Sequence, residues 1–453
     1  MNQYTRRRFL KRGTQTLLGA GLALGAHPLR SLAYGQDLTQ SVGDGYRALV
    51  CIYLEGGCDG FSLMLPTGSY EQQAFSQARG NLAVSQSDIL PLGDGTSPIG
   101  LHRSAQALQS HYDSGNLAMI SNVGTLIQPT TVEQYNNNAV ALPAQLFSHS
   151  DQAIQWQQLQ GRTSSIEGWG AKAAQYLDAY QQRDYLTSIS LAGSNYWQTG
   201  ATRRPFTLTE DGVLEYIGMN PEDTWEQPRR EAFERVLEIE QTHLMTKAYR
   251  DLQKHALAVT TELGMTLEGN AGMFDDTPEE NPLAAKLAMV AQIIAQQESL
   301  GLQRQIFYVT MPGFDVHDNQ SQQQPELFSQ LATAIDYFQT KMSALGQSDN
   351  VTAFTASDFG RSLLSNGDGT DHGWGNHLMA IGGAVRGGRI YGTLPTLSAD
   401  GPDSVHHGRI LPTLSATQYA ATLLDWVGLQ PHEVNTVLPT LPNFGQTNLG
   451  FLA

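Results

Sequence analysis

Acidic and histidine residues gather at four places in this sequence, and their side chains are of the kinds that bind divalent metal ions. Three of the four places fall within about sixty residues. Carboxylate and imidazole groups are ligands for Zn²⁺, Mn²⁺ and Mg²⁺. The residue types therefore predict a metal site built from distant segments. The four clusters are Asp59 in LEGGCDGFS, Asp315 and His317 in PGFDVHDNQ, Asp358 in TASDFGRS, and Asp371, His372 and His377 in GTDHGWGNH.

The spacing within two of these clusters suggests specific roles. Asp315 and His317 are two residues apart, so in an extended segment both side chains point to the same side and can reach one metal. Asp371 and His372 can instead form a pair in which the carboxylate orients a ligating imidazole.

Three further residues have open roles. Arg361 follows Asp358 by three residues, and its planar guanidinium group matches a phosphate or sulfate; it can equally form a salt bridge with Asp358. His102 in GLHRS and His149 in LFSHSDQ are further candidate ligands.

Apolar runs alternating with helical patterns predict the elements that position these residues. Continuous rather than alternating hydrophobicity is typical of strands buried on both faces of a parallel sheet. The alternation indicates a doubly wound, mostly parallel α/β sheet with helices on both faces. The predicted strands are 48–54, 117–123, 189–192, 306–311, 351–356 and 378–381, and the predicted helices are 104–111, 229–263, 282–300, 325–345 and 417–427.

The candidate ligands lie beside the ends of these strands. Asp59 follows the first strand across Gly56-Gly57, Asp358 directly follows the letters FTAS at 354–357, and His377 opens the run 378–381. In open α/β sheets, ligands bind beyond the carboxyl ends of the strands. We therefore expect these side chains to meet at one sheet edge, although any one aspartate could instead cap a following helix.

The rest of the chain favours one acidic domain. We expect a single domain over residues 34–453, with a helical insertion around 221–281.

The part of the chain after residue 33 is strongly acidic. Residues 1–33 carry six of the 27 basic residues and no acidic ones, so the remainder has 21 basic and 43 acidic residues, a net charge of −22. Such a surface repels nucleic acid and anionic lipid. Nucleic-acid binding is thereby excluded as an expected function.

The N-terminus predicts an export signal over residues 1–33. Twin arginines in TRRRFLK precede a short apolar stretch, 17–26, and small residues at 31–33. This pattern is typical of twin-arginine signals, and the apolar stretch is shorter than the roughly 20 residues that a membrane span needs. We expect recognition by the twin-arginine export machinery, a periplasmic or otherwise exported mature protein, and no stable membrane insertion.

The motifs GG-x-DG, GFD-x-H-x-x-Q, SDFGR and G-x-DHGWG, behind a twin-arginine signal, resemble an exported bacterial family, domain of unknown function 1501. That family is placed in the alkaline phosphatase-like superfamily, with the sulfatases. The resemblance implies one or two divalent ions (Zn, Mn, Mg or Ca) that clamp a phosphate or sulfate ester. It implies that Asp59 and Asp358 hold one ion, and that Asp315, His317 and either His372 or His377 hold the other.

The chain departs from that superfamily beside Asp358. The superfamily often has Asp-His where this chain has Asp358-Phe359, so the first site lacks a ligand unless His372 supplies it. The formylglycine patterns Cys-x-Pro-x-Arg and Ser-x-Pro-x-Arg are absent from the sequence, which speaks against a formylglycine sulfatase. One complete metal site is therefore the safer expectation.

The nucleophile is assigned from position alone. Ser148 precedes a predicted helix, where a metal and the helix dipole can activate a hydroxyl; Ser148 or Ser150 can instead simply cap that helix, and Thr125 is a further candidate. The sequence thus predicts an exported hydrolase of a small anionic phosphate or sulfate ester, with Arg361 steadying the ester oxygens. The alternative is a non-catalytic periplasmic metal-binding or structural protein that retains the hydrolase fold.

Overall fold

A ten-stranded sheet forms the centre of the protein. The computed structural model describes residues 45–162, 165–214, 216–219, 223–268 and 271–453, so the predicted signal at 1–33 lies outside the described residues. The strands lie in the order β14 (Arg389–Tyr391), β5 (Leu117–Gly124), β13 (Asn376–Ile381), β10 (Val351–Ser357), β1 (Arg47–Leu54), β9 (Arg304–Met311), β6 (Ser188–Ser190), β7 (Phe206–Thr209) and β8 (Gly212–Val213), with β17 (Leu414–Ser415) beside β5.

The sheet is mostly parallel, as predicted. β1 pairs in parallel with both β9 and β10, and β6 continues the parallel run from β9. β13 is antiparallel to both of its neighbours, and β8 is antiparallel to β7. The predicted fold class, a doubly wound α/β sheet, is confirmed.

Side-chain alternation along β1 explains why this strand is apolar throughout. Residues on one face, such as Val50 and Ile52, pack in a core with helices α10 and α11. Residues on the other face, such as Leu49 and Tyr53, pack in a second core with α7 and α12. Successive side chains of a strand point to opposite faces, so a strand covered on both sides needs apolar residues at every position.

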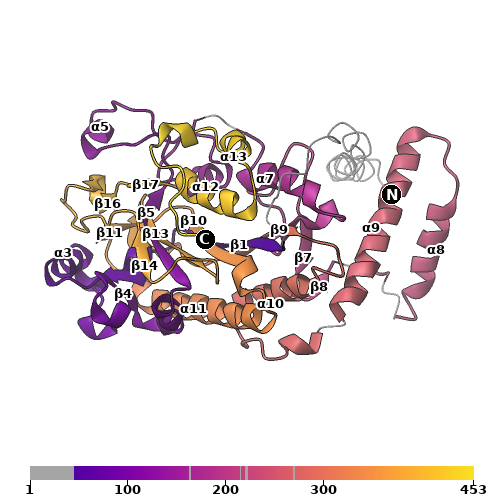
Figure 1. Ribbon diagram of the computed structural model, residues 1–453, viewed down its shortest axis with the longest axis horizontal. Helices are drawn as coiled ribbons and strands as arrows, with labels where there is room; N and C mark the ends of the chain where they lie inside the picture. The colour runs from indigo at the N-terminus through magenta and orange to yellow at the C-terminus, as the bar shows by residue number, and fades with distance from the viewer. Residues whose placement is uncertain (1–44, 163–164, 215, 220–222, 269–270) are drawn as a thin grey trace, which may run out of the picture.

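Helices cover both faces of the sheet (Figure 1). In that view α10 and α11 lie below the sheet, and α7, α12 and α13 lie above it. The helices are α2 (Gly60–Leu63), α3 (Ser69–Arg79), α4 (Gln109–Asp113), α5 (Val132–Asn136), α6 (His149–Gln158), α7 (Trp169–Leu177), α8 (Gln227–Glu238), α9 (Leu244–Glu268), α10 (Pro282–Ala295), α11 (Gln320–Ala344), α12 (Ala416–Val427) and α13 (Pro431–Val437).

The predicted helix 229–263 is two helices, α8 and α9, which stand at one end of the molecule (Figure 1). Ile239 leaves helical geometry with φ −64° and ψ 124°, and this ends α8. The β-branched side chain of Ile239 has a lower helix propensity than its neighbours. The chain then folds back, so that Lys254 of α9 forms an ion pair with Glu238 of α8 at 2.8 Å.

Smaller sheets complete the fold near the strand ends. Strand β11 (Arg361–Ser365) pairs with β12 (Thr370–His372), and this pairing sets Arg361 opposite His372. The other two are β2 (Met64–Pro66) with β4 (Ile99–His102) and β3 (Ile89–Pro91), and β15 (Ser404–Val405) with β16 (Arg409–Ile410).

The turn after β1 requires glycine at two positions. Gly56 and Gly57 have φ of +108° and +84°, a region that favours glycine. A Cβ atom on Gly56 would lie 2.4 Å from the backbone nitrogen of Asp315, and one on Gly57 would lie 2.5 Å from the Phe359 ring. The two glycines therefore let three loops that follow parallel strands approach closely.

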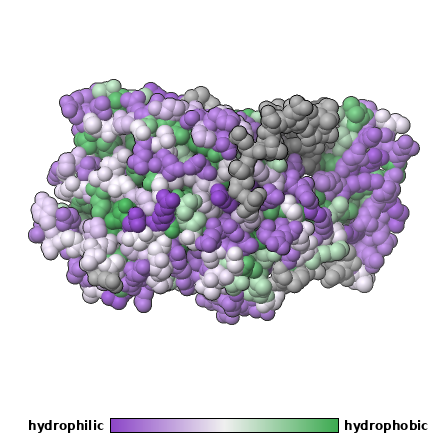
Figure 2. Space-filling model, viewed as in Figure 1, coloured by the Kyte–Doolittle hydropathy of each residue, from purple (hydrophilic) through white to green (hydrophobic). Residues whose placement is uncertain are grey.

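The visible surface is mainly hydrophilic, with apolar residues in small groups (Figure 2). Among the described helices, none combines the length and the apolar character needed to cross a bilayer.

Candidate metal centre

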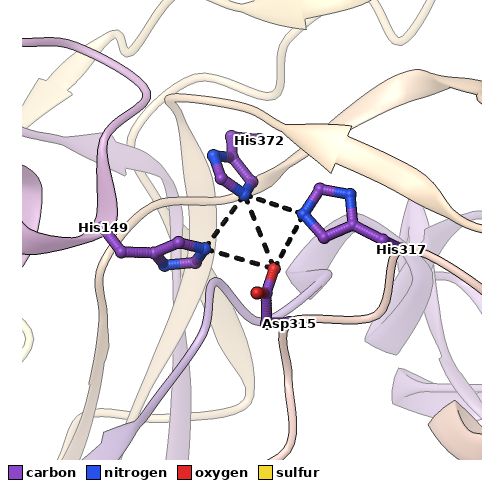
Figure 3. Close-up of side chains that lie close together, drawn as sticks. All are labelled: His149, Asp315, His317 and His372. Carbon is purple, nitrogen blue, oxygen red and sulfur yellow. Dashed lines mark hydrogen bonds and ion pairs between the residues drawn. The ribbon is translucent and has the colours of Figure 1, made fainter.

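Three imidazole rings and one carboxylate converge at the carboxyl end of the central strands (Figure 3). Ligand atoms of His149, Asp315, His317 and His372 all lie within 4.8 Å of one another. The Nε2 atom of His372 lies 2.9 Å from Nε2 of His149 and 2.9 Å from Nε2 of His317. Oδ1 of Asp315 lies 3.2, 3.0 and 3.5 Å from Nε2 of His149, His317 and His372, respectively.

The four candidate ligands come from three different parts of the fold. Asp315 and His317 lie in the loop after β9, His149 is the first residue of α6, and His372 is the last residue of β12. Because β1, β9 and β10 are parallel and in register at Leu54, Met311 and Ser357, their following loops meet at one sheet edge.

An oxygen atom faces Nδ1 of each imidazole. Nδ1 of His149 lies 2.7 Å from Oδ2 of Asp358, and Nδ1 of His372 lies 2.7 Å from the backbone oxygen of Phe147. Nδ1 of His317 lies 3.6 Å from Oδ1 of Asp371. We assign the proton of the neutral His149 and His372 rings to Nδ1 from their 2.7 Å partners, which leaves an Nε2 lone pair on both rings.

The convergent lone pairs fit a cation. Two unprotonated nitrogens 2.9 Å apart repel unless a positive species lies between them. Tetrahedral Zn²⁺, with Zn–N of about 2.0–2.1 Å, would place its ligand atoms roughly 3.3 Å apart. The five measured separations, 2.9 to 3.5 Å, bracket this value. The oxygen partners behind the imidazoles are of the kind that orient metal-bound histidines.

Arg361 lies behind the cluster rather than at its open side. Its side chain is fully buried, and its NH1 donates to Asp315 Oδ1 at 3.0 Å and to the Gly56 oxygen at 3.2 Å. The other guanidinium nitrogens donate to the hydroxyl and backbone oxygen of Thr370. The sequence interpretation predicted that Arg361 binds the ester oxygens of the substrate. In the structure its donors are already engaged, and it fixes the orientation of Asp315.

Asp358, which the sequence interpretation placed among the ligands, contacts the four-residue candidate cluster through His149. One of its oxygens faces His149 Nδ1 at 2.7 Å, and the other accepts from the Tyr53 hydroxyl at 2.6 Å. The carboxylate is nearly buried and also accepts from the backbone N–H of Gly56 at 3.3 Å. Asp358 therefore orients a ligand and raises its basicity.

Phe359 packs against two of the imidazoles. Its ring centroid lies 4.7 Å from those of both His149 and His372, and it is stacked on His372 with an interplanar angle of 30°. The residue that departs from the superfamily pattern thus serves as an apolar support for two ligands.

Asp59 lies outside the cluster, because its carboxylate has other partners. Oδ1 forms an ion pair with Arg79 at 2.5 Å, and both side chains are fully buried. Oδ2 accepts from Gln320 at 3.0 Å, and Oδ1 also caps α2 by accepting from the Ser62 N–H at 3.3 Å. The helix-capping alternative is therefore the one found at Asp59. No local sequence signal pairs it with Arg79, which is twenty residues away.

Two other histidines are also placed apart from the cluster. His377, predicted as a ligand, is buried in β13, where its Nδ1 accepts from the Asn122 N–H at 3.2 Å and its ring packs edge-on against Phe61. Burial lowers the pKa of His377 to about 3, so it stays neutral in the core. His102 caps a turn by accepting from the Ser104 N–H at 3.2 Å.

Ser148 immediately precedes the ligand His149 and is the N-cap residue of α6. Its hydroxyl donates to Asp151 Oδ2 at 2.6 Å and makes no capping hydrogen bond to the helix backbone. A hydroxyl paired with a carboxylate has an acceptor for its proton. This arrangement retains Ser148 as a candidate nucleophile.

His149 is the cluster member that the sequence interpretation offered only as a further candidate ligand, beside His102. It follows no predicted strand and stands far from the other clusters in the chain, so strand-end reasoning did not select it. The one local feature that could have indicated His149 is its position at the start of a predicted helix, since the first side chain of a helix can project beyond the helix end.

We expect metal affinity to fall as pH is lowered through the histidine range. The hydrogen bond to Asp358 raises the pKa of His149 above its ordinary value of 6.5, whereas burial lowers that of His372. A proton on His149 must leave before metal binds, so apparent affinity should drop about tenfold per pH unit below that raised pKa. In the metal-free protein the His149–Asp358 pair stabilises the folded state at low pH. This stabilisation is lost as the pH rises through the raised pKa of His149.

Competition with a chromophoric chelator at a series of pH values measures this dependence. The Asp358→Asn variant removes the main cause of the raised pKa, so its affinity should begin to fall at a lower pH than that of the wild type. An affinity that stays constant between about pH 8 and pH 5.5 would contradict assignment of His149 as a ligand.

Comparison with known proteins gives a family and distant structural likenesses. A family model described as "Protein of unknown function (DUF1501)" matches residues 46–430. No curated protein matches the chain. The chain is similar to the lipoteichoic acid synthase LtaP from Listeria monocytogenes, with 7% identity, 89% of this chain and 74% of that chain covered, and a TM-score of 0.33.

A second solved structure with a similar chain course is the phosphonate monoester hydrolase SpPMH from Silicibacter pomeroyi. The identity is 9%, the match covers 85% of this chain and 74% of that chain, and the TM-score is 0.34. Because both likenesses are distant, we derive the function from this chain's own side chains.

Proposed function

We infer a function for this chain, which belongs to the family described as "Protein of unknown function (DUF1501)", from its own side chains. We propose that the protein is a metal-dependent hydrolase of a phosphate or sulfate ester. The observation that carries this proposal is the convergence of three Nε2 atoms and one carboxylate oxygen at the carboxyl edge of the sheet. Ligand-binding sites of open α/β sheets lie at this edge.

The proposed ligands are His149, Asp315, His317 and His372, with one divalent ion in place of the pair implied by the superfamily. When bound, such an ion polarises an ester oxygen and stabilises the charge that develops during displacement. The ligands remain accessible to substrate, because the side chains of His149, Asp315 and His317 are 31%, 48% and 42% exposed. Asp358, Asp371 and Arg361 hold these ligands in orientation.

Ser148 is the proposed nucleophile, and its replacement gives a direct test. Ser148→Ala should lower kcat for nitrophenyl phosphate or nitrophenyl sulfate by at least about 100-fold, because no attacking hydroxyl remains. Hydrolysis is measured after loading with Zn²⁺, Mn²⁺, Mg²⁺ or Ca²⁺. Ser299→Ala is the matched control, since that exposed hydroxyl donates only to the backbone and side-chain oxygens of Gln296, the residue that follows α10.

The possible outcomes distinguish the assignment of Ser148 as nucleophile from the proposal that the protein is a metal-dependent hydrolase. Full activity in Ser148→Ala would move the nucleophile elsewhere while leaving the metal centre in place. Wild-type protein that binds metal but hydrolyses neither ester with any of the four ions would overturn the hydrolase proposal.

A second candidate function rests on the number of ligands. Four protein ligands can complete a tetrahedron, which is the arrangement of structural rather than catalytic zinc sites. This favours a non-catalytic metal-binding or assembly protein that retains the hydrolase fold. The exposure of the ligand side chains favours the hydrolase.

We also propose export by the twin-arginine route to the periplasm or beyond. The support is the sequence of residues 1–33, in which TRRRFLK precedes a short apolar stretch and small residues. Export of a folded protein is compatible with a fold in which the two cysteines, Cys51 and Cys58, are buried and unpaired.

A further inference from the structure

A cavity of about 410 Å³ adjoins the candidate metal centre. His149 and Asp358 form part of its wall, so the cavity and the metal cluster share the His149 ring. Its other walls come from the carboxyl ends of β1 and β9, the loop after β6, and α6. Its size is in the range of small-molecule sites. An ester held at the metal can therefore extend its alcohol portion into this cavity.

Two buried hydroxyl groups reach the cavity from β9. Tyr308 and Thr310 lie on the same face of the strand, are 3% and 8% exposed, and both line the cavity. Within the described residues, neither hydroxyl has a protein hydrogen-bond partner. Neither oxygen is among the fully buried, unpartnered polar atoms of the described residues, so both retain accessible surface at the cavity. These two are consequently available to a hydroxyl-bearing ligand.

The remaining lining is mixed: Ala153, Ile154 and Ala192 are apolar, and the other residues are polar. Ser150, Ser194 and the amide side chains of Gln157 and Asn195 line the cavity. Glu55 and Asp358 add carboxylates, and the lining residues, all in the described part of the chain, include no lysine or arginine. A second phosphate, a nucleotide or a uronic acid would meet these carboxylates, and the nearby amine of Lys286 is already engaged, because it donates to the backbone oxygen of Thr310 at 2.9 Å.

The rim supplies an aromatic surface. Tyr196 lines the cavity and is 50% exposed, so part of its ring is open to a ligand. The C–H face of a sugar ring packs on such a ring, while its hydroxyls bond to the surrounding polar groups. A fatty acyl chain would instead leave the Tyr308 and Thr310 hydroxyls without partners.

We propose that this cavity binds the alcohol portion of the ester as an uncharged, hydroxyl-rich unit, a sugar or polyol. The orientation toward the metal rests on the proposed function, whereas binding of the sugar itself does not. The substrate class that follows is a sugar or polyol phosphate or sulfate ester.

Direct binding of free sugars tests the proposal independently of hydrolysis. Calorimetric titration of the purified full chain with glucose, galactose, mannose and glycerol should give saturable binding of at least one. Tyr308→Phe and Thr310→Val each remove one hydroxyl, so each should weaken that binding about 2- to 10-fold. Tyr70→Phe, at a tyrosine 76% exposed on α3, is the control and should change nothing.

Three results would overturn the proposal: no binding of any of these compounds, binding unaffected by both variants, or glucuronate bound as tightly as glucose. Near-ultraviolet circular dichroism establishes that the variants are folded. Loss of nitrophenyl ester hydrolysis with sugar binding intact would count against the proposed function alone, so the two proposals can fail separately.

Discussion

Replacement of His372 by alanine is expected to lower metal affinity by more than about 100-fold. His372 is the central ligand, because its Nε2 lies 2.9 Å from the Nε2 atoms of both other histidines. Removal of a single outer partner of a ligand already costs about 10- to 100-fold in affinity, and removal of the ligand itself should cost more. Chelator competition on protein purified without added metal gives the affinity, and elemental analysis gives the stoichiometry.

His432→Ala serves as the matched control for this variant. His432 is exposed on α13, away from the cluster, so its loss should leave affinity and stoichiometry unchanged. If His372→Ala bound one equivalent of metal as tightly as the wild type, the cluster would not be the metal centre, and the hydrolase proposal would lose its basis.

Replacement of Arg79 by methionine should reduce the free energy of unfolding by about 3–5 kcal/mol. The Asp59–Arg79 pair is fully buried on both sides, with an N–O distance of 2.5 Å. Methionine leaves the Asp59 carboxylate buried without its cation, and the Gln320 amide and Ser62 N–H offer it no full charge. Urea unfolding followed by circular dichroism measures the change.

Two companions make this result interpretable. Arg103→Met breaks the ion pair between Arg103 and Asp88, whose side chains are 54% and 49% exposed, respectively. This variant should lower the free energy of unfolding by less than about 1 kcal/mol. The double variant Asp59→Leu/Arg79→Met removes both charges and should be less destabilised than Arg79→Met alone. Equal stability of Arg79→Met and wild type would contradict a buried pair and reopen a metal role for Asp59.

The sequence was sufficient to predict the sheet and the edge at which the site lies. A strand such as β1 that is covered on both faces must be apolar at consecutive positions. Such a strand can therefore be predicted from its own short segment of sequence. The side chains of Asp315 and His317 lie 3.0 Å apart, as their two-residue spacing and their place after β9 led us to expect.

The tertiary structure decided which of the candidate side chains share that centre. Asp59 and Asp358 both follow parallel strands, yet Arg79 and Gln320 bind the first, and Tyr53 and His149 bind the second. A carboxylate takes whichever donors the fold brings within about 3 Å, and those donors can lie anywhere in the chain.

Tertiary packing also explains why His149 belongs to the cluster and His377 does not. His149 belongs to it because α6 begins beside the edge of the sheet. His377 lies apart from it because β13 directs its ring into the core against Phe61. Residue type and strand position are properties of the sequence, and they determined the chemistry available to this protein. Which nitrogens point at one another depends on how distant segments pack, and only the folded chain determines that.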